Sequence, residues 1–140
     1  MTYALSWPLQ RAIYDTLAAD PTLTALLGGR IYDAPPPFEA DAAPDAIWVT
    51  LGDERVDDWS TKDSSGAVHM LAIAVHAPQR GFGEAKDVAG VISDVLTGAA
   101  LAPERGRVVH VGFVSGRTRR SDNDLMRRVE LRFRVLVEDA

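Results

Sequence analysis

The last segment of the chain alternates almost perfectly between apolar and charged residues. Its apolar positions are Val129, Leu131, Phe133, Val135 and Val137, and its charged positions are Arg128, Glu130, Arg132, Arg134 and Glu138. Because successive side chains of a β-strand point to opposite faces, this pattern predicts a strand with one buried face and one charged face. We therefore expect the sheet that contains it to be covered by helices on one side only at this strand.

The first helix signal lies near the N-terminus. Leu9, Ile13 and Leu17 recur every four residues, which places them on one face of an amphipathic helix that extends to about residue 19. Ser6 stands where an N-cap residue is expected. A second start signal, the dipeptide Asp20-Pro21, follows at once. The chain therefore predicts a helix and then a separate short helical turn.

The clearest helix signal begins near Gly83. Its apolar residues follow helical spacing and its polar residues lie opposite them; the apolar set is Ala85, Val88, Ala89, Ile92, Val95 and Leu96. Gly98 is expected to end this helix, because glycine adopts the backbone conformation that commonly terminates helices.

Four further segments are rich in β-branched or aromatic residues and predict strands. They are residues 30–33, 46–51, 67–77 and 107–115, the last continuing to residue 120. Both faces of the third segment are apolar, which is typical of a central strand. The prolines within 34–45 predict an extended loop, the polar stretch 53–65 predicts a long loop or a flexible hairpin tip, and a turn signal at 121–124 precedes the last strand.

These elements predict an α+β fold in a single domain that spans residues 1–140. We expect an antiparallel or mixed sheet of about four to five strands, with two main helices packed on one face and a long C-terminal hairpin. A chain of 140 residues with 46% hydrophobic composition can bury one core without disulfides or metal.

The charges are sorted along the chain. The formal net charge is −5, which argues against general adhesion to nucleic acids or anionic membranes. Residues 1–100 hold 6 basic and 14 acidic side chains, a balance of −8, whereas residues 101–140 hold 9 arginines and 6 acids, a balance of +3. This asymmetry suits a subunit that presents surfaces of unlike sign to different neighbours. A basic, solvated hairpin on an acidic body is the alternative.

Cysteine is absent, which excludes disulfide scaffolds, thiolate metal sites, iron–sulfur clusters and thiol nucleophiles. No apolar run approaches the length of about 20 residues that a bilayer-spanning helix needs. The first residues also lack the charged region and apolar core of a signal peptide. We therefore expect a cytosolic protein.

The remaining residues give no catalytic, cofactor or metal site. His69 and His76 are seven positions apart, so an unbroken strand puts them on opposite faces and they cannot bind one metal together. The acidic cluster at Asp53, Glu54, Asp57 and Asp58 lacks the glycine and the regular oxygen spacing of a calcium loop, which favours simple solvation. The serines lie in no nucleophile elbow, and residues 81–83 lack the further glycine of a phosphate-binding turn.

Arginine is concentrated around the predicted C-terminal hairpin tip. The residues are Arg117, Arg119, Arg120, Arg127 and Arg128. Guanidinium groups there can pair with phosphates or with the carboxylates of a partner. No aromatic residue interleaves them, which disfavours a base-stacking platform, and Asp122 and Asp124 dilute the patch. A partner protein with acidic groups fits better than sequence-specific nucleic-acid readout, and a merely solvated tip is the other alternative.

Taken together, many weak motifs resemble the tail completion, or tail terminator, proteins of long-tailed bacteriophages and prophages. The segments that carry the resemblance are 9–17, 20–23, 26–28, 30–33, 47–52, 58–62, 83–86 and 127–134. The likeness spans nearly the whole chain and is most similar to the version carried by the gene transfer agents of alphaproteobacteria. The turn at 122–124 departs from it, because an Asp-Gly type of turn is expected there.

The resemblance implies a non-enzymatic ring, a hexamer, on the head-proximal end of the tail tube. Such a ring ends tube polymerisation and contacts the neck or stopper protein, with DNA only as passing cargo and no membrane partner; it is assembled in the bacterial cytoplasm and stays in the particle. The residues we expect at protein interfaces are Asp53, Asp57, Asp58, Trp59, Lys62, Arg117, Arg119, Arg120, Arg127 and Arg128. Another neck protein, a stopper or a head-completion subunit, is the alternative in the same class. A small nucleic-acid-binding module is the alternative in another.

Overall fold

The computed structural model describes residues 3–33, 46–78, 82–120 and 126–139. In chain order the helices are α1 (Ser6–Ala19), α2 (Pro21–Leu27) and α3 (Gly83–Gly98), and the strands are β1 (Ile31–Tyr32), β2 (Trp48–Asp58), β3 (Ser65–Pro78), β4 (Arg107–Arg120) and β5 (Met126–Asp139). The described strands form one sheet in the order β1-β2-β3-β5-β4. β1 runs parallel to β2 and the other neighbours are antiparallel, so the predicted α+β fold with a mixed sheet is confirmed.

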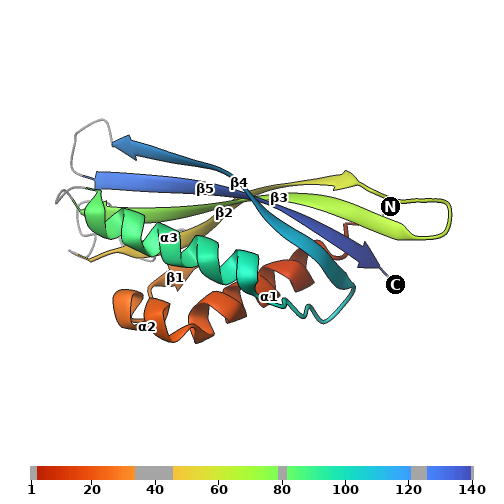
Figure 1. Ribbon diagram of the computed structural model, residues 1–140, viewed down its shortest axis with the longest axis horizontal. Helices are drawn as coiled ribbons and strands as arrows, with labels where there is room; N and C mark the ends of the chain where they lie inside the picture. Colours follow the sequence, from red (N-terminus) through yellow and green to blue (C-terminus); the bar gives the residue numbers. More distant parts are fainter. Residues whose placement is uncertain (1–2, 34–45, 79–81, 121–125, 140) are drawn as a thin grey trace.

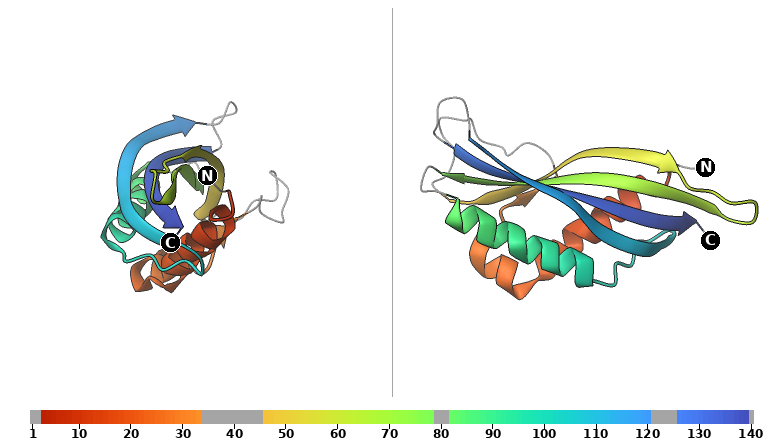
Figure 2. Two further views of the ribbon diagram at one scale, coloured as in Figure 1. Left: turned by 90° about the vertical axis from the view of Figure 1, so that its right-hand side faces the viewer. Right: turned by 45° about the horizontal axis from the view of Figure 1, so that its top comes forward.

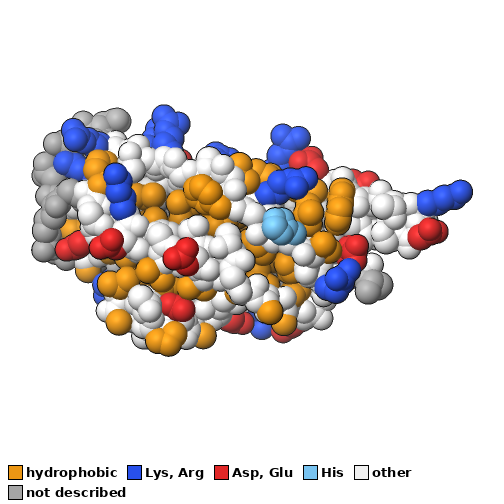
Figure 3. All heavy atoms as spheres, in the orientation of Figure 1, with side chains coloured by type: hydrophobic (Ala, Val, Ile, Leu, Met, Phe, Trp, Pro, Cys, Tyr) orange, Lys and Arg blue, Asp and Glu red, His pale blue; other side chains and the backbone are white. Residues whose placement is uncertain are grey.

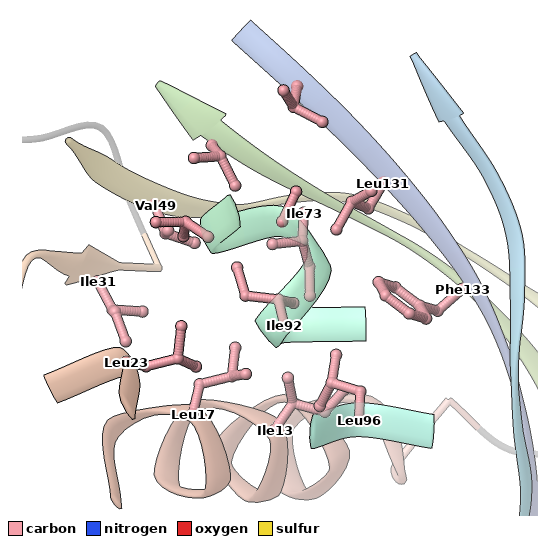
Figure 4. Packing of buried hydrophobic residues seen from close by; sticks show 14 of the residues in the cluster. Ile13, Leu17, Leu23, Ile31, Val49, Ile73, Ile92, Leu96, Leu131 and Phe133 are labelled. Carbon is pink, nitrogen blue, oxygen red and sulfur yellow. The ribbon is translucent and has the colours of Figure 1, made fainter. Parts of the chain in front are cut away.

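The described helices all lie on one face of the sheet (Figures 1 and 2). The core fills the space between the two layers, where Ile13 and Leu17 of α1 and Ile92 of α3 point towards the sheet (Figure 4). The alternation predicted for the last strand is confirmed, because its apolar residues are buried; they are Val129, Leu131, Phe133, Val135 and Val137. Full burial of such a side chain contributes about 1.5–3 kcal/mol, so β5 is a main anchor of the helix layer.

Strands β3 and β5 form the long axis of the molecule. They pair without interruption from Ser65 opposite Asp139 to Pro78 opposite Met126, a ladder of 14 residue pairs. At roughly 3.3 Å per residue this ladder is about 45 Å long. The central position predicted for β3 is confirmed, and the twisted sheet extends past the helices at one end (Figure 2). The two ends of the sheet are therefore well separated.

The two helix starts have different caps. Asp20 caps α2 as predicted, since its Oδ2 accepts a hydrogen bond from the Leu23 backbone N–H at 3.0 Å. The N-cap prediction for Ser6 is wrong, because Ser6 is the first residue of α1 and the cap position is Leu5, whose side chain makes no capping hydrogen bond. The Ser6 hydroxyl instead donates to the carboxylate of Glu54. Ser6 therefore donates to a partly buried carboxylate on a strand of the sheet and does not accept a hydrogen bond from an N–H group of its own helix.

The predicted loop 53–65 is wrong in its first half. Strand β2 continues to Asp58, with a register shift between Leu51 and Glu54, and only residues 59–64 form the turn. Acidic residues have low strand propensity, but pairing with β3 overrides it, and the irregularity re-aims the strand so that Glu54 and Val56 face the helices. Helix α3 ends at Gly98 as predicted, but not by the expected glycine conformation, because Gly98 is its last helical residue and the C-cap is Ala99 in extended backbone. The proline loop 34–45, the turn 121–124 and Gly81 lie outside the described residues.

Candidate assembly surfaces

A buried polar cluster connects the start of α1 to the sheet. His69 Nδ1 lies 3.2 Å from Glu54 Oε2, and the Ser6 hydroxyl donates to the other oxygen of the same carboxylate. Burial alone would raise the pKa of Glu54, but hydrogen bonds from His69, Ser6 and Tyr3, together with the charge of His69, lower it below its ordinary value. The carboxylate stands between serine and histidine, so the histidine cannot take the proton of Ser6. This cluster therefore holds α1 in place and is not arranged as a nucleophilic triad.

The second strand histidine has a different environment. His76 lies on the helix-free face, so the prediction that His69 and His76 occupy opposite faces is confirmed. Its ring stacks on Trp48 with centroids 5.0 Å apart, and its Nε2 lies 2.9 Å from the Thr50 hydroxyl. Burial, with the nearby positive charge of Arg128, lowers the pKa of His76 to about 4. His76 is therefore neutral at physiological pH and serves as a packing residue.

Within the part of the chain that the structure describes, no three His, Asp or Glu side chains come close enough to hold a metal ion. The acidic cluster at 53–58 is divided between the two faces of the sheet. Glu54 faces the helices, whereas Arg55 and Asp57 face away from them and pair with each other, with Arg55 Nε 3.0 Å from Asp57 Oδ2. This division follows from the strand geometry, so the acidic side chains of 53–58 do not all converge on one site.

The turn between β2 and β3 forms a projecting arm, residues 57–66, at one end of the sheet (Figure 1). Two backbone hydrogen bonds hold the arm. The Trp59 N–H donates to the Gly66 carbonyl at 2.9 Å, and the Thr61 N–H donates to the Ser64 carbonyl at 2.9 Å. Gly66 is required here, because a Cβ would lie 2.8 Å from the Trp59 carbonyl oxygen. Trp59 remains 40% exposed, and Lys62 is exposed near the tip. The arm thus presents a large aromatic side chain on an ordered turn.

The arginine cluster lies at the opposite end of the sheet. Arg119 and Arg128 share Glu130, at 3.4 and 3.1 Å, whereas Arg117 and Arg120 are exposed and have no ion-pair partner among the described residues. Arg127 differs, since it is only 8% exposed and its guanidinium lies 5.5 Å from the Phe82 ring centre. The cluster is therefore a mixture of exposed charges and one packed cation.

The register places the arm and the arginine cluster far apart. Asp58 is opposite Ala67 on β3, whereas Arg120 is opposite Arg127 and through it Ala77. Ten residues along β3 correspond to about 33 Å. The arm and the cluster therefore cannot pair within one chain. Asp53 is the exception among the predicted acids, because it lines a groove of about 310 Å³ on the helix-free face together with Arg119, Arg128, Glu130 and Arg132.

Sequence reasoning did not identify a third surface, the apolar part of β4. Val109, Phe113 and Val114 are 40%, 50% and 47% exposed, although their residue types are typical of a core. The signal was present as the adjacent apolar pairs 108–109 and 113–114, which break the alternation of a regular strand. The structure shows a register shift at each pair.

The chain matches the tail completion protein gp17 family over residues 11–138. It belongs to this family. Among solved structures, it is similar to a chain of the virion of a native gene transfer agent (GTA) particle, with 42% identity, a TM-score of 0.88, and coverage of 98% of this chain and 99% of that chain. Comparison with curated proteins gives no match. The resemblance to tail completion proteins and to the gene transfer agent version is thus confirmed, and this tail completion protein is a structural protein of the phage-tail type. Its described helices include none long and apolar enough to cross a membrane.

Proposed function

We propose that this tail completion protein forms a ring, a hexamer, that caps the head-proximal end of the tail tube. The ring ends tube polymerisation and joins the tail to the neck, without catalysis, cofactor or metal. It assembles in the bacterial cytoplasm, remains in the particle and surrounds DNA only as passing cargo. The observation that carries the proposal is the 42% identity to a chain of a gene transfer agent virion over 98% of this chain.

The separation of the arm from the arginine cluster supports this function. A cap must bind the tube at one face and a different protein at the other, because a ring with two tube-like faces would allow further growth. When the long sheet lies along the ring axis, the arm of every subunit reaches one face and the arginine cluster reaches the other. Asp57, Asp58, Trp59 and Lys62 then contact one neighbour, and Arg120 and Arg128 contact the next. Arg127 supports this end by packing against Phe82.

Removal of the gene from a particle-producing strain tests the proposal. Overlong tail tubes, measured by electron microscopy, are expected, because nothing else ends tube growth. Purified protein added to polymerising tube protein should shorten the tubes. Tubes of normal length accompanied by tailless heads would instead assign the chain to the stopper or head-completion class. Normal particles would refute both assignments.

Variants at the two ends test whether they bind different neighbours. One variant reverses the charge of Arg119 and Arg120, and the other truncates Trp59 to Ala. The two variants should arrest assembly at different steps. One should stop before the ring joins the tube, and the other should stop before the tail joins the head. Reversal of Arg11 and Lys86, two exposed cations of the helix layer, changes the net charge equally and should leave particles intact. Unchanged ring formation and tail attachment in the Arg119 and Arg120 variant would refute the role of this cluster.

A further inference from the structure

The helix-free face of the sheet is basic, although the chain as a whole is acidic. Partners in strand register point to the same face, so the charged side of β5 continues onto β3, β2 and β4. Along the described strands this face carries Arg55, Arg107, Arg117, Arg119, Arg128, Arg132 and Arg134 against Asp53, Asp57, Glu130 and Glu138. The balance is +3, whereas the whole chain has a net charge of −5. Figure 3 shows basic side chains along the side of the molecule opposite the helices.

Ion pairs within this face leave three of its arginines unpaired. The pairs are Arg55 with Asp57, Arg107 with Glu138, and Glu130 with both Arg119 and Arg128. Arg117, Arg132 and Arg134 are exposed and have no ion-pair partner among the described residues. Arg132 and Arg134 are two residues apart on β5, and Arg117 is diagonal to Arg132 on β4, about 7–8 Å away. Like charges this close repel one another, so an anion that contacts all three would be stabilised.

The surroundings of these arginines favour a phosphate backbone over a protein surface. Arg132 lies between Ala72 and Ser115 of the neighbouring strands, so small side chains leave its guanidinium accessible. Among the described residues, no large apolar side chain of β2, β3 or β5 is exposed. Protein interfaces depend on buried apolar and aromatic anchors, whereas contacts to phosphates are made by guanidinium groups on polar, positively charged surfaces. The face has the second composition and lacks the first.

The aromatic groups of this face favour a duplex over a single strand. They are Trp48 and His76, which stack on each other, and Trp48 is only 7% exposed. Proteins bind single strands largely by stacking bases on exposed aromatic side chains, and no such platform is present on the described strands of this face. A duplex instead presents closely spaced phosphates along its length. The arginines of β5 from Arg128 to Arg134 extend over about 20 Å along the long axis of the sheet.

We infer that the helix-free face binds the phosphate backbone of duplex DNA through Arg117, Arg132 and Arg134, and that it lines the channel of the ring. The inference rests on the proposed function, in which the sheet lies along the ring axis and the ring surrounds DNA. The contact reads no sequence, because guanidinium groups on phosphates carry no base information. Three unpaired charges on an otherwise acidic chain give a weak, salt-sensitive contact, so the DNA is held in the channel and can still slide.

Fluorescence anisotropy of a labelled duplex of mixed sequence, titrated with the purified chain over a salt series, tests the inference. The unmodified chain should bind at low salt and release the duplex as the salt concentration rises. R132Q with R134Q should weaken binding at low salt by about 10-fold or more, and the slope of log affinity against log salt should become shallower by about 2, because two phosphate contacts are lost. R132K with R134K keeps both charges and should retain the slope. Circular dichroism confirms that each variant is folded.

A matched control separates this face from net charge. R11Q with K86Q removes the same charge from exposed positions of the helix layer and should bind the duplex like the unmodified chain. An equal loss of affinity in this control would overturn the assignment to the helix-free face. Tighter binding of a single strand of the same length would overturn the assignment to duplex DNA.

Two further outcomes would overturn the inference while leaving the cap intact. One is the absence of duplex binding by the unmodified chain at low salt. The other is the loss of self-association in R132Q with R134Q without any change in duplex binding, measured by native mass spectrometry, which would assign the face to contacts between subunits. The tube-length experiment tests the cap separately, and R132Q with R134Q should still give tubes of normal length.

Discussion

Strands β4 and β5 have the same length and share one ladder, but they use their side chains differently. Along β5, alternate residues are buried from Val129 to Val137, whereas no residue of β4 is buried. β5 has a strand on each side and helices beneath it, and β4 has a strand on one side only. The comparison teaches that position in the sheet decides the role of a strand. The apolar residues of β5 stabilise the subunit, whereas Val109, Phe113 and Val114 of β4 are exposed.

Figure 3 shows how charge follows the same division. Acidic side chains lie over α3 and basic ones are spread along the sheet. Arg132 and Arg134 of β5 point to the helix-free face and are exposed, as is Arg117 of β4. The sorting of charge along the chain therefore becomes a difference between α3 and β2, which carry a net negative charge, and β4 and β5, which carry a net positive charge. Truncation of side chains on β4 and on β5 measures how far the stability of the subunit depends on each strand.

Phe133 and Phe113 give the largest expected contrast. They are cross-strand neighbours whose rings meet edge to face, with centroids 6.0 Å apart, but Phe133 is fully buried and Phe113 is half exposed. Phe133→Ala should lower the free energy of unfolding by about 3–5 kcal/mol, because it leaves a cavity in the core. Phe113→Ala should cost only about 1 kcal/mol. Urea denaturation of the two variants measures both values. Equal losses would show that β4 also belongs to the core.

His76 gives a smaller effect that depends on pH. Its pKa is about 4 in the folded chain, against about 6.5 for an unperturbed histidine. Above pH 6.5 both states hold His76 neutral. Between pH 6.5 and pH 4 the unfolded chain takes up a proton that the folded chain does not, so stability falls as the pH is lowered, by up to about 3 kcal/mol.

The variant His76→Gln tests this assignment. The slope of unfolding free energy against pH between 4 and 6.5 should become shallower in the variant, because the titrating group has been removed. Arg128→Gln should reduce the slope without removing it, since burial is the larger cause of the low pKa and the charge of Arg128 the smaller. An unchanged slope in His76→Gln would assign the pH dependence to other groups.

Local sequence patterns predicted the elements that are determined by residues close together in the chain. The alternation from Val129 to Val137, the helical spacing from Ala85 to Leu96 and the Asp20 cap each depend on residues close together in the sequence, and each is confirmed. The second half of β2 and the role of Ser6 were predicted wrongly, because both depend on partners far along the chain, β3 in one case and Glu54 in the other. Long-range pairing overrides local propensity in such places.

The candidate surfaces also differ in whether they depend on local sequence or on long-range pairing. Sequence reasoning identified the arginine cluster and the arm by their charge, which is visible locally. It could not show that about 33 Å separates them, because that distance follows from the register of four strands. It also could not show that β4 is an edge, because strand order in a sheet is not determined by any single segment. From the sequence alone, Val109 and Val114 therefore cannot be distinguished from ordinary buried strand residues, because their exposure depends on the strand order of the sheet.

Val109 and Val114 give the smallest expected effect on stability and the sharpest test of the comparison. Replacing both with Ser should change the free energy of unfolding by no more than about 0.5 kcal/mol, because these bulged side chains are 40% and 47% exposed and add little to the core. The same change on β5, Val135→Ser, should destabilise the chain by more than 1 kcal/mol, since it buries a hydroxyl in an apolar site. Self-association should respond in the opposite sense: it should weaken in the β4 variant and persist in folded Val135→Ser. A β4 variant that associates normally would show that the two bulged valines take no part in contacts between subunits.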